Sequence, residues 1–348
     1  MSLLWMDGFD HYDGVVGNLA LAGYTNASNV SLVTNRARTG SYCLRGGAIS
    51  TCEIIRPLPS SLQTIGIAGA FWFGSMGTRE IFEFIQSDGS LSTPNCTISY
   101  DSTGRIRFSR QSYAGPLLGQ SAPGVITQNA WNHIEARVVI SNTIGACQIR
   151  VNGVEVLNTT NVDSLFTGLE LCPAVRIALP GSSTGDGYAY LDDLFIWDTS
   201  GSQNNNFLGD RKVTTLNLTD NTAVSEWGYT GAASPVQCIN GTQDGDTSYI
   251  YAGSSVPVTS EFEFANADGT IGLIAGVQTV NVMRKVEAGT VIVQPSLVSG
   301  GSATDNGSHS VGDNYAYFNM MHQTNPATGM PWTASALNSA RLRLRRTT

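Results

Sequence analysis

Two pairs of acidic residues are the first candidates for chemistry in this chain: Glu80 with Glu83, and Glu261 with Glu263. Retaining glycosidases hold two carboxyl groups about 5–5.5 Å apart, and residues two or four apart on one strand face meet that need. Glu80 and Glu83 are three apart and are predicted on opposite faces of a strand. Glu261 and Glu263 share a face but lie in the second half of the chain. We therefore predict no catalytic residues and no enzyme, with a polysaccharide hydrolase as the third hypothesis.

The histidines offer little further material for catalysis. The chain has four, His11, His133, His309 and His322, and none lies near a serine or cysteine in a nucleophile-elbow context. His133 falls in a predicted strand, next to a residue expected to point inward. A solvent-facing or structurally hydrogen-bonded role is favoured for it over that of a general base.

Acidic residues near the two ends of the first half could bind calcium. The adjacent pair Asp192 and Asp193 begins an apolar strand, and Asp7, Asp10 and Asp13 crowd the first strand. Calcium prefers carboxylate and backbone carbonyl oxygens, and the rims of β-sandwiches supply both. The simpler interpretation is turn chemistry, in which an aspartate caps a loop, and it is favoured over metal binding. Calcium is thus the one cofactor considered.

Aromatic residues in glycine-rich loops are candidate glycan contacts, because an aromatic ring can stack on a sugar face. Tyr113, Trp227 and Tyr229 lie in such loops. Three further tryptophans, Trp72, Trp131 and Trp197, lie within predicted strands, and they are predicted to be core residues.

The charge of the chain argues against nucleic acid as a partner. Its 348 residues carry a net charge of −8, and only 13% of them are charged. Neutralising phosphates needs a basic face. The one basic cluster, residues 341–346, alternates arginine with leucine and predicts a final strand with arginines on one face. A structural edge or contact between subunits is favoured there over an anionic partner.

The N-terminus and the cysteines predict neither export nor metal–thiolate chemistry. No basic segment and apolar core resembling a secretory signal opens the chain, and no apolar run reaches membrane-spanning length, so membrane insertion is not expected. The six cysteines are scattered singly, without the close spacing of a zinc site. They are predicted to be small buried hydrophobic residues, with disulfides as the alternative: Cys43, Cys52, Cys96, Cys147, Cys172 and Cys238.

The elements that must position all these residues are β-strands. Residues 131–141 alternate apolar and polar side chains, and residues 147–151 and 154–157 repeat the pattern around Asn152 and Gly153. An Asn-Gly loop between alternating strands predicts a type I′ hairpin, because both central residues need a positive φ. About ten such strands are predicted before residue 200, with no helix, and they indicate a β-sandwich.

A polar run at residues 198–206 predicts a domain boundary. Beyond it, further strands are expected, among them residues 212–218 and a long strand over 271–286. An alanine-rich segment at residues 332–340 predicts one short helix capped by Thr333. The prediction is an all-β protein with a jelly-roll sandwich at residues 1–200 and a smaller β-rich assembly domain at 201–348.

The first 198 residues resemble the laminin-G-like, concanavalin A-like jelly roll. Three segments carry the resemblance: Trp-Asn-His-Ile-Glu at 131–135, Gln-Ile-Arg-Val-Asn-Gly at 148–153, and Tyr-Leu-Asp-Asp-Leu-Phe-Ile-Trp-Asp at 190–198. In related sandwiches calcium is held near the first and last strands. That property maps loosely onto Asp7, Gly40 and Asp192 here. The acid motif of the hydrolase members is not matched.

The whole chain is also similar to virion structural proteins of tailed bacteriophages. This second resemblance is carried by residues 192–213, 284–289 and 325–333. It implies a structural component of the phage tail, fibre or capsid surface, located in the virion and in contact with other virion proteins. From the β-rich C-terminal region we expect a homo-oligomer, with a trimer favoured. The alternative is a lectin-like carbohydrate-binding module that contacts a glycan of the host cell surface.

Overall fold

The protein is almost entirely β-structure, as the alternating patterns predict. The computed structural model describes residues 2–48, 52–87, 89, 91–181, 187–240, 243–267, 271–305 and 307–348. The chain divides into two compact units. The first comprises Met1–Asp10 and Gly14–Thr214, and the second comprises His11–Asp13 and Thr215–Thr348. Residues 201–214, which follow the predicted boundary at residue 200, therefore belong to the first unit.

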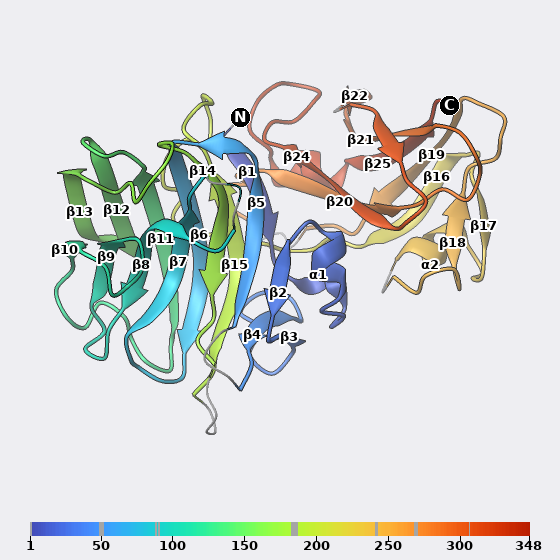
Figure 1. The fold of residues 1–348 in the computed structure, drawn as a ribbon. Helices are drawn as coiled ribbons and strands as arrows, with labels where there is room; N and C mark the ends of the chain where they lie inside the picture. Colours follow the sequence, from blue (N-terminus) through green and yellow to red (C-terminus); the bar gives the residue numbers. More distant parts are fainter. Residues whose placement is uncertain are drawn as a thin grey trace. The chain divides into compact units, whose positions relative to one another are not determined.

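The first unit is a β-sandwich of two antiparallel sheets that lie face to face (Figure 1). An eight-stranded sheet has the order β13-β12-β11-β6-β15-β4-β3, and β1 pairs with β15 beside this path. Its strands, in chain order, are β1 (Leu3–Asp7), β3 (Val30–Val33), β4 (Cys43–Gly46), β6 (Thr64–Phe73), β11 (Trp131–Val139), β12 (Gly145–Val151), β13 (Val154–Val162) and β15 (Ala189–Trp197).

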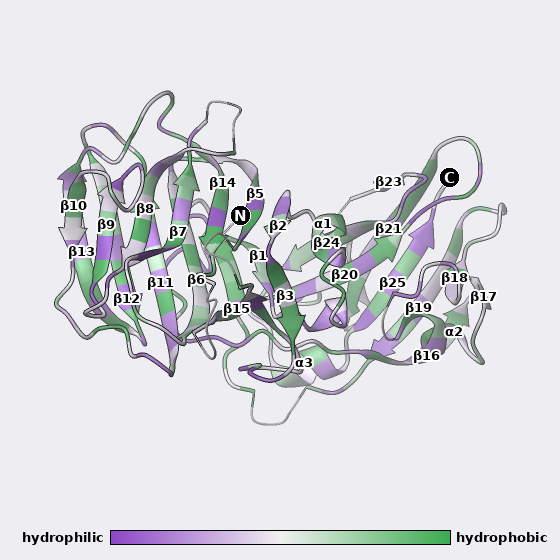
Figure 2. Cartoon of the chain, turned by 60° about the horizontal axis from the view of Figure 1, so that its bottom comes forward, coloured by the Kyte–Doolittle hydropathy of each residue, from purple (hydrophilic) through white to green (hydrophobic). Residues whose placement is uncertain are grey.

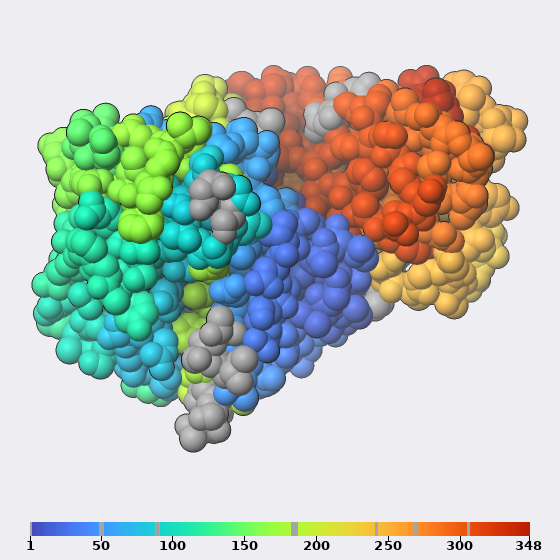
Figure 3. Space-filling model, viewed as in Figure 1, coloured from blue at the N-terminus to red at the C-terminus, as the bar shows by residue number. Residues whose placement is uncertain are grey.

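The second layer of the sandwich is a seven-stranded sheet with the order β10-β9-β8-β7-β14-β5-β2. In the space-filling view, side chains close the gap that the ribbon leaves between the two layers (Figure 3). The core is apolar and fully buried, with Phe71, Phe82 and Phe108 among its largest side chains. The strands of this layer are β2 (Asn26–Ser28), β5 (Glu53–Leu62), β7 (Arg79–Ile85), β8 (Pro94–Tyr100), β9 (Ile106–Arg110), β10 (Leu117–Gln120) and β14 (Cys172–Ala178).

The central hairpin forms as its sequence predicts. Asn152 and Gly153, with φ angles of 50° and 80°, connect β12 to β13. Along β12 buried and half-buried residues alternate strictly, because successive strand side chains point to opposite faces. Figure 2 shows this alternation as hydrophobic and hydrophilic bands along the strands. The hairpin therefore has one face toward the core and one away from it.

Two of the tryptophans predicted to be core residues lie on the outward face of the eight-stranded sheet instead. Trp72 and Trp131 are directly opposite each other on β6 and β11, are half-buried, and meet edge to face with their ring centroids 6.1 Å apart. Arg36 lies over the Trp72 ring at 4.2 Å. Trp197 is fully buried, as predicted.

The second unit is built on one antiparallel sheet with the order β16-β19-β25-β21-β22, and β23 pairs with β21 beside it. Two short ladders, β17–β18 and β20–β24, accompany this sheet. Its strands are β16 (Leu218–Ser225), β17 (Gly228–Thr230), β18 (Tyr249–Tyr251), β19 (Val258–Phe264), β20 (Val277–Met283), β21 (Val291–Ser299), β22 (Ser302–Asp305), β23 (His309–Val311), β24 (Ala316–His322) and β25 (Arg341–Arg346).

Helices are few and short in the described chain. Helix α3 (Ala334–Asn338) confirms the predicted C-terminal helix, and the Thr333 side chain caps it by accepting a bond from the Ala336 amide. The sequence analysis missed α2 (Pro235–Ile239), which Ser234 caps in the same way, and also α1 (Asn18–Leu21) and a 3-10 turn at Asp10–Tyr12 in the N-terminal region. Among the described residues, no helix is long and apolar enough to cross a lipid bilayer.

Two predicted strands of the second half were placed wrongly. Residues 212–217 form no strand, and β16 begins only at Leu218. The long strand expected over residues 271–286 is reduced to β20, which is paired only over Val277–Met283. An apolar, β-branched composition marks residues that suit a strand, but it does not provide the partner strand that pairs their backbone.

The arginine-rich C-terminal strand is central in its sheet rather than at an edge. β25 pairs with β19 on one side and with β21 on the other. Leu342 and Leu344 face a small core, while Arg343 Nη2 lies 2.7 Å from Glu261 Oε1. Glu261 and Glu263 share a face, as predicted, and both face arginines of β25. They therefore form structural ion pairs within the sheet.

The cysteines behave as small buried side chains. All six are free thiols, and five of them are buried; Cys238 is half-buried. Burial raises the pKa of Cys172 to about 12, so this thiol stays protonated and unreactive at neutral pH.

A glycine-to-alanine change at Gly66 tests the packing of the eight-stranded sheet. A Cβ atom added there would lie 1.9 Å from Trp197 Cε2, so the buried indole must move. We expect Gly66→Ala to lower the free energy of unfolding by about 1–3 kcal/mol, the usual cost of overpacking. Urea unfolding followed by tryptophan fluorescence measures it. Gly77→Ala is the matched control, since nothing lies within 4 Å of its added Cβ; an equal loss in both variants would contradict the packing argument.

Candidate functional site

Polar side chains gather on the outward face of the eight-stranded sheet. On β11, Ile134 and Ala136 point into the core, so the alternate residues His133, Glu135 and Arg137 point outward. The strand register places Arg137 opposite Gln148 of β12, which in turn lies opposite Asn158 of β13. This face therefore presents rows of hydrogen-bonding groups from neighbouring strands.

A segment that follows β15 crosses part of this face. We call residues 204–213 the strap. The backbone amides of Leu208 and Gly209 donate hydrogen bonds of 3.0 and 2.9 Å to Glu135 Oε1. The Phe207 ring meets Trp197 edge to face, with centroids 6.0 Å apart, and lies 4.3 Å from the guanidinium carbon of Arg150. The polar run predicted as a domain boundary is thus attached to the sandwich.

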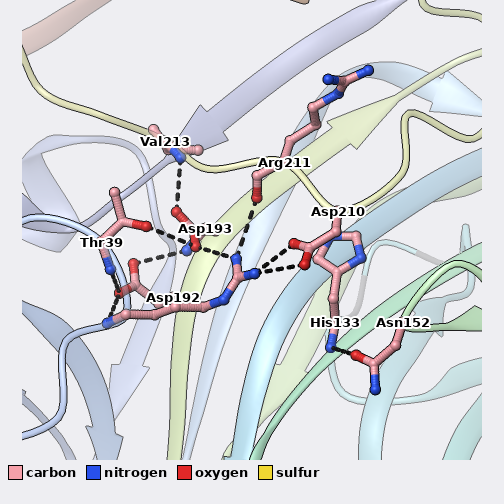
Figure 4. A network of polar contacts seen from close by, with 9 residues as sticks. Thr39, His133, Asn152, Asp192, Asp193, Asp210, Arg211 and Val213 are labelled. Carbon is pink, nitrogen blue, oxygen red and sulfur yellow. Dashed lines mark hydrogen bonds and ion pairs between the residues drawn. The ribbon is translucent and has the colours of Figure 1, made fainter. Parts of the chain in front are cut away.

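Arg38 connects the strap to β15, the last strand of the sandwich, through Asp210 and Asp193, which are both labelled in Figure 4. Its Nη1 donates to Asp193 Oδ2 at 2.6 Å, and its Nη2 donates to both carboxylate oxygens of Asp210, at 2.6 and 2.8 Å. The Val213 amide donates to the other oxygen of Asp193 at 2.7 Å. One guanidinium group therefore bridges a fully buried carboxylate and a half-exposed one.

The two adjacent aspartates of β15 both point into this network because the strand is irregular there. The register with β6 shifts between Asp192 and Phe195, and Asp193 has a φ of 52°. Such a bulge interrupts the alternation and redirects a side chain. Asp192 accepts bonds from the backbone amides of Arg38 (2.7 Å), Thr39 (3.1 Å) and Asp193 (2.8 Å). Both carboxylates are thus satisfied by N–H and O–H donors.

Burial governs the protonation of the acidic groups of this site. It raises the pKa of Asp192 to about 7, and the neighbouring Asp193 charge adds to the effect. Burial also raises the pKa of Asp193, against the opposing hydrogen bond from Val213 and the ion pair with Arg38. The pKa of Glu135 is raised by burial too, and the Gly209 and Leu208 amides oppose that shift.

His133 lies beneath the strap as a neutral imidazole. It is 2% exposed, its ring is beside Asp210 (Figure 4), and its backbone amide donates to Asn152 Oδ1 at 2.9 Å. Burial lowers its pKa to about 4; the Asp210 charge acts in the opposite direction and Arg38 in the same direction. Neither ring nitrogen has a hydrogen-bond partner among the described residues. The prediction of a solvent-facing or structurally hydrogen-bonded side chain is therefore wrong for the ring of His133.

Beside the strap, the same face carries an open groove of about 520 Å³. We call it the groove. Its walls come from β6, β11, β12 and β13, and Thr199 lines it from the segment after β15. Six of the nine residues that line it carry polar side chains, and the nine are Thr64, Arg137, Val139, Ala146, Cys147, Gln148, Asn158, Thr160 and Thr199.

The residues considered for calcium form capped turns in the structure. Asp7 accepts bonds from the Phe9 amide (2.8 Å) and the Tyr24 hydroxyl (2.9 Å). Gly40 has a φ of 65° and packs against Asp10, whose Oδ1 accepts from the Ser41 amide at 2.6 Å. Asp192 is bonded to backbone amides, as described above. No group of three or more His, Cys, Asp or Glu side chains within the described ranges is placed to hold a metal ion.

The residues considered for glycan contact are divided between the two units. Tyr113 is exposed in the first unit, between β9 and β10, and Tyr229 is exposed on β17 of the second unit. Trp227 is half-buried against the core around Phe262, and its indole N–H donates to Val258 O at 3.3 Å. Trp227 is therefore mainly a packing residue, whereas Tyr113 and Tyr229 are each exposed in their own unit.

The acidic pair of β7 is structural. A register shift between Glu80 and Phe82 interrupts the strict alternation on which their opposite placement was predicted. Glu80 is close enough to contribute to the raised pKa of Glu83, whose largest cause is burial. The Glu83 carboxylate lies 2.6 Å from Arg176 Nη1 of the neighbouring strand β14, so it is engaged in a largely buried ion pair.

Sequence reasoning missed the residues that organise this face. Arg38 stands in a turn, and Asp210 stands four residues after the polar run at 198–206 that predicts a domain boundary. Arg137 and Gln148 were recognised only as outward positions of an alternating pattern. A signal did exist for the first two: the unusual Asp192-Asp193 pair inside an apolar strand requires a cationic partner, since buried charges are paired.

The chain matches no known protein-family model, and no curated protein matches its sequence. Among solved structures, it is similar to an alginate lyase in complex with an alginate tetrasaccharide, at 19% identity and a TM-score of 0.38, over 56% of this chain and 95% of that one. It is also similar to a sialidase, at 11% identity and a TM-score of 0.36, over 57% of this chain and 19% of the sialidase chain. A carbohydrate-binding module from Bacillus subtilis has 9% identity and a TM-score of 0.30, over 50% and 98%.

These findings correct two predictions from the sequence. The similar structures are lyases, sialidases and a carbohydrate-binding module, and none of those described above is a virion protein. They contradict the predicted role as a structural virion component and the predicted lack of enzymatic activity, and both predictions are dropped. At these identities and TM-scores the likeness assigns no substrate or reaction to this chain. The predicted virion location and trimer are not tested and stay predictions.

Replacing Arg38 tests how far the carboxylate network depends on it. Arg38→Met keeps most of the aliphatic stem but leaves the buried Asp193 carboxylate without its cation. We expect a loss of about 3–5 kcal/mol in unfolding free energy at pH 7.5, measured by urea unfolding. The control is Arg110→Met, which removes an exposed ion pair with Asp163 and should cost at most about 1 kcal/mol. Equal losses would contradict a special role for Arg38.

The buried His133 predicts a loss of stability in acid. Its folded-state pKa of about 4 is below that of an exposed histidine, so only the unfolded chain takes up this proton as the pH falls through about 6.5. The unfolding free energy should therefore decrease from pH 6.5 toward pH 4. The unfolding free energy of His133→Phe should decrease less than that of the wild type, by about 2 kcal/mol at pH 5. Urea unfolding at pH 5 and pH 7 measures the difference. Identical pH profiles would show that His133 is not held neutral.

Proposed function

We propose that the first unit is a carbohydrate-binding module that holds a glycan chain in the groove on the outward face of the eight-stranded sheet. One observation carries the proposal: hydroxyl, amide and guanidinium groups from four neighbouring strands converge on one open groove. These groups belong to Thr64, Arg137, Gln148, Asn158 and Thr160.

The arrangement of these side chains suits the hydroxyl groups of sugars. Neighbouring strands hold their residues about 4.8 Å apart, and alternate residues on one strand are about 6.7 Å apart. Amide side chains both donate and accept hydrogen bonds, as do threonine hydroxyls, and so do sugar hydroxyls. Because the backbone of each strand is fixed by its partners, such a row needs little reorganisation when a ligand binds.

The charge in the groove favours an acidic glycan. Arg137 Nη2 donates to Gln148 Oε1 at 2.9 Å, and Arg137 forms no ion pair with any acid in the described chain. A guanidinium group binds a carboxylate with two parallel hydrogen bonds. The overall charge of −8 does not prevent this. Salt screens exposed charges that lie more than about 8 Å apart at physiological ionic strength, so charges in close contact with the ligand determine the interaction. A sugar carboxylate is therefore the proposed partner of Arg137.

Removing the Arg137 side chain tests this proposal. The purified chain is screened against neutral and uronate-containing oligosaccharides, and affinities are measured by calorimetry. We expect binding of a uronate oligosaccharide, weakened about tenfold or more in Arg137→Ala, since a hydrogen bond to a charged group contributes about 1.5–3 kcal/mol.

The matched control is Arg107→Ala, which removes a half-buried arginine from β9 of the other sheet. Its affinity should equal that of the wild type. If no oligosaccharide binds, or if both variants lose the same affinity, the groove is not a glycan site.

A further inference from the structure

Three buried polar side chains beneath the strap lack part of their hydrogen bonding. Both ring nitrogens of His133, Oε2 of Glu135 and Nε1 of Trp197 have no partner among the described residues, although these side chains are at most 2% exposed. A buried polar atom left unpaired costs about 1–3 kcal/mol. The closed strap therefore covers donors and acceptors that it does not itself satisfy.

The strap is held by few and mostly polar contacts. None of its residues is buried, and it contains no helix or strand. Its polar attachments include the hydrogen bonds from the Leu208 and Gly209 amides to Glu135, the hydrogen bond from the Val213 amide to Asp193, and the bonds of Arg38 to Asp210 and to the Arg211 carbonyl oxygen. Asp210 is 48% exposed in that pair, and such ion pairs contribute little. Segments with little apolar burial open locally at low free-energy cost.

The surface beneath the strap is continuous with the groove. Phe207 of the strap lies 5.8 Å from the guanidinium carbon of Arg137, which lines the groove. Along β6, the outward residues beside Arg137, Glu135 and His133 are Gly66, Ala68 and Ala70. These three residues are small, and the Trp197 indole packs against Gly66.

We propose that the strap covers an extension of the glycan groove whose polar groups are His133, Glu135 and Trp197, and that an acidic oligosaccharide reaches it by displacing the strap. The inference rests on the proposed function. Sugar hydroxyls supply both donors and acceptors for the three side chains, and a sugar carboxylate replaces that of Asp210 at Arg38. The strap and the glycan then compete for one surface, so weakening the strap raises the apparent affinity.

Asp210→Ala tests the proposal, because it removes the ion pair between the strap and Arg38 and changes no residue of the sheet. Asp163→Ala is the matched control: Asp163 is 41% exposed and pairs with Arg110 elsewhere in the first unit. Without ligand, hydrogen exchange at the Leu208 and Gly209 amides should be severalfold faster in Asp210→Ala than in the wild type, as expected for the loss of a half-exposed ion pair. In Asp163→Ala it should be unchanged.

A uronate hexasaccharide is the ligand probe for the same proteins. Its affinity should rise severalfold in Asp210→Ala and stay unchanged in Asp163→Ala. At saturation it should speed exchange at Leu208 and Gly209 in the wild type, because the strap is displaced; a ligand confined to the groove would leave those amides protected.

The outcomes separate the two proposals. Binding that depends on Arg137 but is unaffected by Asp210→Ala, with the strap amides still protected, keeps the glycan groove and overturns the covered extension. If no protein binds the hexasaccharide, the proposed function fails, and the glycan assignment of the covered surface fails with it. If the strap amides exchange as slowly as those of β11 in every variant, the strap is not displaceable. This conclusion holds whatever the ligand measurements show.

Discussion

The bridge that Arg38 makes between Asp193 and Asp210 is the interaction on which the organisation of the outward face depends. Asp192 and Asp193 stand side by side with no exposure to solvent, and two buried carboxylates without a cation would repel each other and be poorly solvated. Arg38 compensates Asp193, while backbone amides satisfy Asp192. The bulge in β15, the turn at Arg38 and the path of the strap are thus coupled through one guanidinium group.

This coupling divides one continuous sheet face into two parts with different chemistry. In the open part, Gln148, Asn158 and Arg137 present their polar ends to solvent around the groove. In the covered part, His133 and Glu135 are buried. Burial lowers the pKa of His133 and raises the pKa of Glu135, so it favours the neutral form of each. The same strand, β11, contributes to both parts. The difference arises only from whether the strap lies above it, because burial rather than residue type decides the cost of a charge.

The all-β fold was predictable from the sequence because its determinants are local. The alternation along residues 131–141 and the Asn152-Gly153 turn specify the hairpin that the structure contains. The candidate site was not predictable, since its partners are far apart in the chain: Arg38 and Asp193 are 155 residues apart. Trp72 and Trp131 were misplaced for a related reason. A tryptophan in an alternating strand looks like core, and its true environment depends on Arg36, which packs over Trp72 from another segment.

Composition alone could not separate a particle component from a glycan-binding protein. A neutral, hydroxyl-rich and amide-rich surface is compatible with both. The low fraction of charged residues, 13%, describes the whole chain rather than one face. The spatial arrangement does discriminate, because glycan recognition needs polar groups converging on one concave surface that is largely formed in advance. Thr64, Gln148, Asn158 and Thr160 come from three different stretches of sequence, and strand pairing brings them to one groove. The sheet register, not the abundance of polar residues, therefore supplies the argument for binding.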